Sequence, residues 1–461
     1  METKGCMLIL VRFLMGRLTF LFCVRTLSVL LLAQVFTLSA EEPGRRQTTS
    51  SAVSSLVNSD KAFVDWVRKN AVPFRTVEAG NGFTDLSPIG DIVGESRIVA
   101  LGEATHGTRE FFLLKHRIIE YLASRKGFTV FSIEANMPEA YRLNDFVLRG
   151  EGDPKQLLKG MYFWTWDTRE VLDLILWMRE FNRSGKGHLE FTGFDMQKPT
   201  VAMEIVKGFV QRQEPGYSDH VAQIYNDVLP KAKALGIASG PAGSRVDKKR
   251  LAAGCAEIVK HLEDRRAMFV THSKPDDVEW AIQMARVVHQ SVQMAIGEKS
   301  RDESMADNVK WIAEHSHGAK LVLWAHNGHI TYEGYSYAPM GKYLKEMFGS
   351  QIVNFGFRFN EGSFRAIGSD NRLHEFTIGP APDDSLDHAL SSTGLPLFAL
   401  DVRKLPKDGP VAAWAAEPHL SRSIGAVYGG PDDPSSLVDS PVHDMFDVIL
   451  FVNKTSAAHA N

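Results

Sequence analysis

Four apolar segments with the composition of buried strands are each followed at once by acidic or histidine side chains. These side chains are Glu103, His106, Glu134, Asp195, His326 and His329. In an open α/β sheet the carboxyl ends of parallel strands meet at one edge, and ligands bind there. We therefore expect the six side chains to converge on a single site.

Histidine beside carboxylates points to acid–base chemistry on water. A carboxylate that holds one imidazole nitrogen leaves the other free to take a proton at neutral pH. His106 is the expected base, with Glu103 and Glu134 orienting the imidazole and the water. His326 or His329 would then stabilise the oxyanion or protonate the leaving alkoxide. This interpretation requires no cofactor.

The same residue types also permit a metal site. His326 and His329 with Glu103 or Glu134 would form a set of two histidines and one carboxylate. The sequence contains no His-Glu-x-x-His motif, so a zincin-like site is not indicated. Metal-dependent hydrolysis therefore remains the alternative account of these side chains.

Several other kinds of chemistry lack their usual motifs. The sequence has no Gly-x-Ser-x-Gly elbow for a serine nucleophile. It also has neither a P-loop nor a Gly-x-Gly-x-x-Gly after a strand, which disfavours nucleotide-dependent reactions. A net charge of -3 without long runs of one sign provides no general attraction to nucleic acid. A small-molecule substrate is expected.

An aromatic segment between the second and third strands offers a candidate wall for a bulky ligand. It contains Trp164 and Trp166, preceded by Tyr162 and Phe163, although such clusters also occur in protein cores. Asp195, at the third strand end, is a further expected substrate contact. So is Arg301, at the start of an amphipathic helix.

The elements that position these residues alternate between short apolar strands and helices. The expected strands are 97–101, 128–133, 189–194, 320–324, 351–355, 397–400 and 446–451. This alternation predicts an α/β fold with a central, largely parallel sheet flanked by helices. Residues 201–316 read almost entirely as helix, which predicts a helical insertion or subdomain. The domain is expected over 59–452, beginning with a helix capped by Ser59, and 453–461 is expected to be a tail.

The first forty residues differ from the rest of the chain. Basic residues from Lys4 to Arg25 precede an apolar run that ends at Phe36, and Ala40 suits a signal-peptidase cleavage site. The apolar run is short for a bilayer span, which disfavours an uncleaved anchor. We therefore expect a signal peptide over 1–40, a flexible lead-in over 41–58, and a periplasmic or secreted protein without a membrane partner.

Five segments in order look like the motif series of the erythromycin esterase family, which includes proteins named for succinoglycan biosynthesis. They are Leu101–Phe111, Ile133–Ala135, Phe191–Asp195, Arg301–Asn308 and Leu323–His329. Each motif alone is modest, but the ordered set is highly specific. The resemblance spans about residues 60 to 452.

This resemblance implies hydrolysis of a cyclic ester by histidine-activated water, without a covalent enzyme intermediate. By position in the motifs, His106 would be the base, Glu103 and Glu134 its carboxylates, and His326 and His329 a second pair. Many proteins with this pattern act on substrates other than macrolides, and an exported location differs from that of cytoplasmic antibiotic-resistance esterases. We therefore expect hydrolysis of a carboxylic ester or lactone.

Two further expectations accompany the resemblance. Lys115 falls where macrolide esterases carry a basic residue, so it is a candidate for substrate binding. An exported binding or accessory protein in polysaccharide metabolism, which would use the same pocket without turnover, is the alternative to an enzyme.

Overall fold

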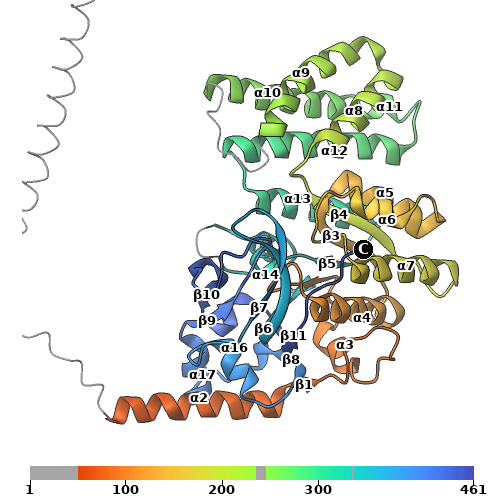
Figure 1. The fold of residues 1–461 in the computed structure, drawn as a ribbon. Helices are drawn as coiled ribbons and strands as arrows, with labels where there is room; N and C mark the ends of the chain where they lie inside the picture. The colour runs from red at the N-terminus through yellow and green to blue at the C-terminus, as the bar shows by residue number, and fades with distance from the viewer. Residues whose placement is uncertain (1–49, 235–244, 335–336) are drawn as a thin grey trace, which may run out of the picture. The chain divides into compact units, whose positions relative to one another are not determined.

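The computed structural model describes residues 50–234, 245–334 and 337–461 (Figure 1). The folded unit spans Asn58–Asn461. The predicted signal peptide over 1–40 and residues 41–49 of the predicted lead-in lie outside the described residues. Within the described part of the chain, no helix is long and apolar enough to cross a membrane.

A nine-stranded sheet forms the centre of the folded unit, in the order β1-β8-β11-β6-β2-β5-β3-β4, with β7 paired to β6. Its strands are β1 Val72–Pro73, β2 Ile98–Leu101, β3 Phe128–Asn136, β4 Glu190–Asp195, β5 Lys320–Trp324, β6 Ile352–Ile367, β7 Leu373–Ile378, β8 Leu397–Asp401 and β11 Val448–Thr455. Neighbouring strands from β11 to β4 pair in parallel, whereas β1, β7 and β8 pair antiparallel. The predicted largely parallel α/β sheet is confirmed.

The central strands of the sheet contribute to cores on both faces, because successive side chains point to opposite faces. In β2, Val99 and Leu101 belong to one core, and Ile98 and Ala100 belong to the other. The first core is covered by α3 Ser87–Val93, α4 Arg109–Arg125, α5 Met137–Arg149, α6 Pro154–Lys159 and α7 Arg169–Arg183. The strands are therefore apolar on both sides, as expected for a parallel sheet buried between helices.

The segment between β4 and β5 is helical over most of its described residues, and Figure 1 shows most of these helices as a bundle at the top, beyond the sheet. They are α8 Thr200–Gln213, α9 Pro215–Ala234, α10 Arg245–Asp264, α11 Arg266–Phe269, α12 Pro275–Ile296 and α13 Arg301–His315. Their apolar side chains join the core of the second face. Only α13 of this group begins with residues of the predicted site.

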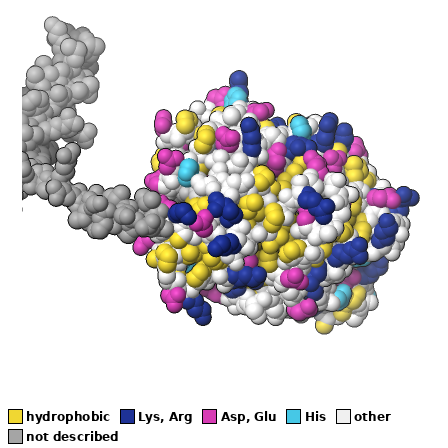
Figure 2. All heavy atoms as spheres, turned by 90° about the horizontal axis from the view of Figure 1, so that it is seen from below, with side chains coloured by type: hydrophobic (Ala, Val, Ile, Leu, Met, Phe, Trp, Pro, Cys, Tyr) yellow, Lys and Arg dark blue, Asp and Glu magenta, His cyan; other side chains and the backbone are white. Residues whose placement is uncertain are grey.

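The remaining elements are short and lie mostly towards the C-terminal part of the chain. They are α14 Asn327–Ile330, α15 Met340–Phe348, η1 Gly349–Gln351, α16 Leu386–Ser391, η2 Val402–Lys404, α17 Gly409–Ala416, β9 His419–Arg422, η3 Pro434–Ser436, β10 Leu437–Ser440 and α18 Val442–Met445. Strands β9 and β10 form a separate antiparallel pair. On the face drawn in Figure 2, basic and acidic side chains are interspersed with apolar ones.

The structure corrects both predicted ends of the domain. Helix α2 is Ser50–Asn70, so it begins nine residues before Ser59, because residues 50–58 contain no proline or glycine that would end a helix. Residues 50–58 are therefore helix rather than flexible lead-in.

The predicted tail at 453–461 is also wrong. Strand β11 continues to Thr455 because the long strand β6 provides a partner as far as Gly362. Beyond the strand, Ala457 and Ala460 form isolated antiparallel bridges with Thr108 and Thr168.

Asn327 fastens the turn after β5 to two neighbouring strands. Its side-chain amide donates to the carbonyl of Phe357 at 2.8 Å and accepts from the Phe357 N–H at 3.1 Å. Its backbone N–H donates to the carbonyl of Glu103 at 2.8 Å. A Cβ at Gly102 would lie 2.2 Å from the Asn327 side-chain oxygen, so only glycine fits there. Asn327 thus fixes the turns after β2 and β5 relative to each other.

We expect Asn327→Ala to lower the free energy of unfolding by about 2 to 4 kcal/mol, because two buried backbone groups of Phe357 lose their partner. Urea unfolding measures the loss. Asn226→Ala, at an exposed position of α9, is the matched control and should change stability by less than about 0.5 kcal/mol. Equal effects of the two substitutions would show that Asn327 does not hold these turns together.

Candidate active site

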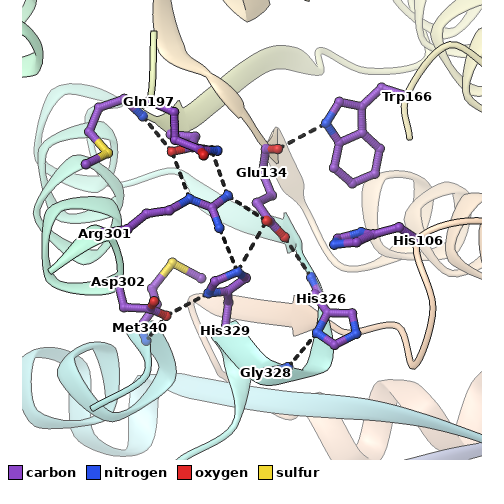
Figure 3. A network of polar contacts seen from close by, with 12 residues as sticks. His106, Glu134, Trp166, Gln197, Arg301, Asp302, His326, Gly328, His329 and Met340 are labelled. Carbon is purple, nitrogen blue, oxygen red and sulfur yellow. Dashed lines mark hydrogen bonds and ion pairs between the residues drawn. The ribbon is translucent and has the colours of Figure 1, made fainter. Parts of the chain in front are cut away.

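The structure brings the polar strand ends together because their strands are neighbours. Strands β2, β5, β3 and β4 lie in that order and pair in parallel, so their carboxyl ends share one edge. Glu103 and His106 come from the turn after β2, and His326 and His329 from the turn after β5. Glu134 lies within the last residues of β3 and Asp195 ends β4. Figure 3 shows how most of these side chains converge.

The contact between Glu103 and His106 determines which nitrogen of His106 is free. Nδ1 of His106 lies 2.7 Å from Oε1 of Glu103. Because an ionised carboxylate only accepts hydrogen bonds, the ring proton resides on Nδ1 and Nε2 carries a lone pair. No described residue bonds Nε2. His106 is thus arranged as a base with its basic nitrogen unoccupied.

Glu103 has 0% exposure, and its second oxygen accepts two further hydrogen bonds. Oε2 lies 2.6 Å from Nζ of Lys115 and 2.7 Å from Nε1 of Trp324. Burial acts to raise the pKa of Glu103, but Lys115 and His106 outweigh it and hold the pKa below its ordinary value. Glu103 is therefore a carboxylate although no water reaches it.

The environment of Lys115 corrects its predicted role. Lys115 is fully buried, its ammonium contacts Glu103, and Nζ lies 4.2 Å from the centroid of the Trp324 ring. Burial lowers the pKa of Lys115 to about 8, against the opposing effect of Glu103. Lys115 does not reach a substrate from this position; it neutralises the carboxylate that orients the base.

Glu134 holds the turn after β5 rather than the base. Its Oε2 accepts the backbone N–H of His326 at 2.8 Å, and its Oε1 lies 2.7 Å from Nη2 of Arg301. Burial acts to raise its pKa, but His329 and Arg301 hold it well below the ordinary value. The backbone carbonyl of Glu134 accepts from Nε1 of Trp166 at 3.0 Å. Among the described residues, no hydrogen bond joins the Glu134 carboxylate to the His106 ring, which was the expected contact.

His326 presents a ring nitrogen of opposite character to that of His106. Its Nδ1 accepts the N–H of Gly328 at 3.1 Å, which places the ring proton on Nε2. This Nε2 is buried and has no partner among the described residues. Burial, followed by the proximity of His106 and His329, lowers the pKa of His326 to about 3. The ring is therefore a neutral donor, with its centroid 5.0 Å from that of His106.

Both ring nitrogens of His329 are occupied. Nδ1 lies 2.8 Å from Oδ1 of Asp302, and Nε2 lies 2.9 Å from Nη1 of Arg301 and 3.3 Å from Oε1 of Glu134. Arg301 favours the neutral ring, whereas the two carboxylates favour the imidazolium. Burial lowers the pKa, but the carboxylates prevail and raise it to about 9. His329 is therefore engaged on both nitrogens within the network and is not a free acid.

The other residues predicted to contact the substrate differ in whether they face the His106 ring. Asp195 is buried and its two oxygens bind Arg301, with Oδ2 at 2.7 Å from Nη2, so it orients Arg301 instead of a substrate. The Arg301 side chain keeps 24% exposure. Trp166 stands edge-on to His106 with ring centroids 6.0 Å apart, whereas Trp164 is half-buried and makes none of the polar contacts described above.

The structure does not assemble the alternative metal set. Among the described residues, no group of three or more His, Cys, Asp or Glu side chains is placed to hold a metal ion. Within the predicted set, His329 has both nitrogens engaged, and Glu103 is bonded to His106 and Lys115.

Most of the chain matches a known protein family. The profile of the family described as Erythromycin esterase matches residues 123–455. The chain belongs to the erythromycin esterase family. The matched range begins after Glu103 and His106, so the placement of these two residues depends on the geometry given above. Membership of the family indicates a hydrolase.

Individual relatives are similar to this chain over most of its length. Erythromycin esterase type II of Escherichia coli is 26% identical over 386 residues, which cover 75% of this chain and 90% of that protein. A Bacillus cereus protein of known structure has a TM-score of 0.75 at 26% identity, covering 87% of this chain and 99% of that one. A solved succinoglycan biosynthesis protein has a TM-score of 0.75 at 25% identity, with the same coverage.

Three side chains that hold the site together are not among the site residues predicted from the sequence. Asp302 binds His329, Trp324 binds Glu103, and Asn327 fastens the two turns. Each lies within a motif that also contains a predicted residue, so the motif was the available signal. From the sequence, Trp324 is predicted only as an apolar strand residue, because hydrophobic periodicity does not reveal the partner of its indole N–H.

We expect Lys115→Met to lower the free energy of unfolding by about 3 to 5 kcal/mol, since it leaves the Glu103 carboxylate buried without its cation. Urea unfolding at pH 7 measures this loss. The double variant Lys115→Met with Glu103→Gln removes both charges and should recover most of it. A double variant no more stable than Lys115→Met would contradict the proposed charge pair.

The same variant has an expected pH dependence. In the wild type the pKa of Glu103 lies below 4.5, so its stabilising effect is present above that pH and is lost as the pH falls. Without Lys115, burial raises the pKa of Glu103, and protonation relieves the buried charge. The stability difference between wild type and Lys115→Met should therefore narrow from pH 7 to pH 5. A difference that widens on acidification would refute this sign.

Proposed function

We propose that the protein hydrolyses a carboxylic ester or lactone by direct attack of water activated by His106. The observation that supports this most strongly is the pair of facing imidazoles with opposite roles. Nε2 of His106 is an unoccupied acceptor and Nε2 of His326 is an unpartnered donor, in rings whose centroids are 5.0 Å apart. Hydrolysis of an ester needs both, one to deprotonate water and one to stabilise the oxyanion.

The reaction proceeds in two steps. Nε2 of His106 takes a proton from water as the water oxygen bonds to the carbonyl carbon, and the carbonyl oxygen becomes an oxyanion. The oxyanion accepts a hydrogen bond from Nε2–H of His326. When the tetrahedral intermediate collapses, the bond to the leaving alkoxide breaks, and the alkoxide takes the proton from the His106 imidazolium. Products are a carboxylic acid and an alcohol, joined in one molecule when the substrate is a lactone.

The buried charges favour this sequence of proton transfers. Glu103 stabilises the imidazolium that forms on His106, because it contacts the protonated Nδ1 at 2.7 Å. The low pKa of His326, about 3, keeps that ring neutral, so its single proton stays on Nε2 for the oxyanion. A preorganised donor in a buried site needs no reorientation as charge develops.

Direct attack by water is supported by the surroundings of the base. His106 Nε2 bonds no hydroxyl or thiol of the described residues, so no side chain there is placed as a nucleophile activated by this histidine. A catalytic metal has no ligand set within the described part of the chain.

The proposed substrate class follows from membership of the family. One relative is named an erythromycin esterase, and erythromycin is a macrocyclic lactone. We propose the broader class of ester or lactone for this chain, with macrolides as one member to be tested. We also propose an exported location, on the basis of the charged and apolar pattern of residues 1–40.

The test is turnover of short-chain aryl esters, simple lactones and a 14-membered macrolide by the purified protein. We expect His106→Gln to lower kcat by about 10²- to 10⁴-fold through loss of the base. His326→Phe should lower kcat by about 10²- to 10³-fold through loss of the oxyanion donor. His188→Gln, at an exposed histidine outside the site, is the matched control and should retain the wild-type rate.

Two outcomes would overturn the proposal. Wild-type protein that hydrolyses nothing in the panel would favour the binding or accessory role instead. Activity that disappears with a chelator and returns with a divalent metal would favour the metal-dependent alternative.

A further inference from the structure

A tripeptide, Thr-Arg-Glu, occurs twice in the chain and opens a helix each time. Residues Thr108–Glu110 begin α4, and residues Thr168–Glu170 begin α7, with Thr108 and Thr168 as the N-caps. Each copy follows a residue of the proposed site by two positions. His106 precedes the first copy, and Trp166 precedes the second.

The first copy binds the chain just beyond β11. Thr108 forms an antiparallel bridge with Ala457. The backbone N–H of Arg109 donates to the carbonyl of Ser456 at 2.9 Å. In return, the carboxylate of Glu110 accepts the N–H and the hydroxyl of Ser456, each at 2.6 Å.

The second copy repeats these contacts three residues further along. Thr168 forms an antiparallel bridge with Ala460. The N–H of Arg169 donates to the carbonyl of His459 at 2.9 Å. The carboxylate of Glu170 accepts the N–H of His459 at 3.1 Å and contacts its Nδ1 at 2.8 Å. Glu170 is buried, whereas the His459 side chain that it contacts is 57% exposed.

We infer that residues 456–460 form a clamp that fixes the spacing between His106 and Trp166. This inference rests on the proposed function, because it assigns the clamp a role in positioning the base. Two attachment points three residues apart in an extended segment are separated by about 10 Å. The clamp thus sets the distance between the two helix starts. Glu110 and Glu170 are positioning residues, since neither touches the reacting atoms.

The physical basis lies in the unpaired amides of a helix start. The first N–H groups of a helix have no partner within the helix, and here the clamp carbonyls accept one from each helix. The two glutamates lie in the first turn, where negative charge is favoured. A further bond, from the Ala458 N–H to the carbonyl of Gly107 at 2.9 Å, reaches the residue next to His106. Detaching the clamp therefore removes one of the attachments of the turn that carries the base.

The turn that carries His106 is also attached to strand β6. The carbonyl of Gly107 also accepts the N–H of Arg365 at 3.0 Å, and a Cβ at Gly107 would lie 2.2 Å from the Arg365 carbonyl. Strand β6 therefore holds the turn from one side and the clamp holds it from the other. Trp166 is edge-on to His106 across a centroid distance of 6.0 Å, so a shift of either helix start changes the wall beside the base.

The experiment compares Glu110→Ala, Glu170→Ala and their Gln counterparts in the full chain. Glu180→Ala, at an exposed glutamate on α7, is the matched control. Amide hydrogen exchange at 106–110 and 166–170 reports the clamp without requiring activity. Steady-state kinetics on an ester that the wild type hydrolyses report the position of the base.

We expect both Ala variants to exchange faster at both helix starts and to lose about 10- to 100-fold in kcat with little change in KM, because a small misplacement of the base is costly. Gln should restore part of the loss, since its amide oxygen still accepts an N–H. Unchanged exchange in the Ala variants would overturn the clamp. Faster exchange with kcat equal to that of Glu180→Ala would overturn its positioning role.

A wild-type protein without hydrolase activity contradicts the proposed function, and with it the proposal that the clamp positions His106. The exchange data then still decide whether the clamp exists, so the two failures are distinguishable.

Discussion

A carboxylate removed from water needs compensation, and Glu103 obtains it from three separate elements. Lys115 comes from α4, Trp324 from β5, and His106 from the turn between β2 and α4. An uncompensated charge at this depth would be strongly unfavourable. The three donors therefore have to meet at Glu103 in the folded state, and their meeting aligns the helix, the strand and the turn. The tautomer of His106 follows directly, because the carboxylate retains the proton on Nδ1.

The rest of the site shows how one residue type acquires different roles from its surroundings. His326 is neutral because burial and two neighbouring histidines lower its pKa to about 3, whereas carboxylates raise the pKa of His329 to about 9. Arg301 links these environments, since it contacts Glu134, Asp195 and His329 at once (Figure 3). Pairs of titratable groups with separated pKa values are a recurrent feature of acid–base catalysis. Here the low pKa keeps His326 neutral as a donor, while His329 remains bound within the network around Arg301.

Sequence reasoning reached the sheet and the convergence because both depend on local patterns. Apolar runs followed by polar residues identify strands and their carboxyl ends, and parallel pairing then brings the ends to one edge. The partners within the site were not predictable in the same way. Arg301 is 167 residues from Glu134, and nothing in its surroundings specifies that contact. Lys115 was expected to bind substrate because its charge is visible in the sequence and its complete burial is not. The sequence predicts a tail at 453–461 because residues 456–460 pair with helix starts, and hydrophobic periodicity does not detect such pairing.

The tautomer of His106 is the most direct test of this account, because base catalysis and the role of Glu103 both depend on it. Nitrogen-15 NMR of histidine-labelled protein at pH 8 distinguishes the two neutral tautomers, and His106→Gln identifies the signals among the 16 histidines. The account predicts a protonated Nδ1 and an unprotonated Nε2, with the Nδ1 proton shifted by the hydrogen bond to Glu103. A proton on Nε2 with a bare Nδ1 would contradict it, since Nε2 would then have no lone pair to accept a proton from water.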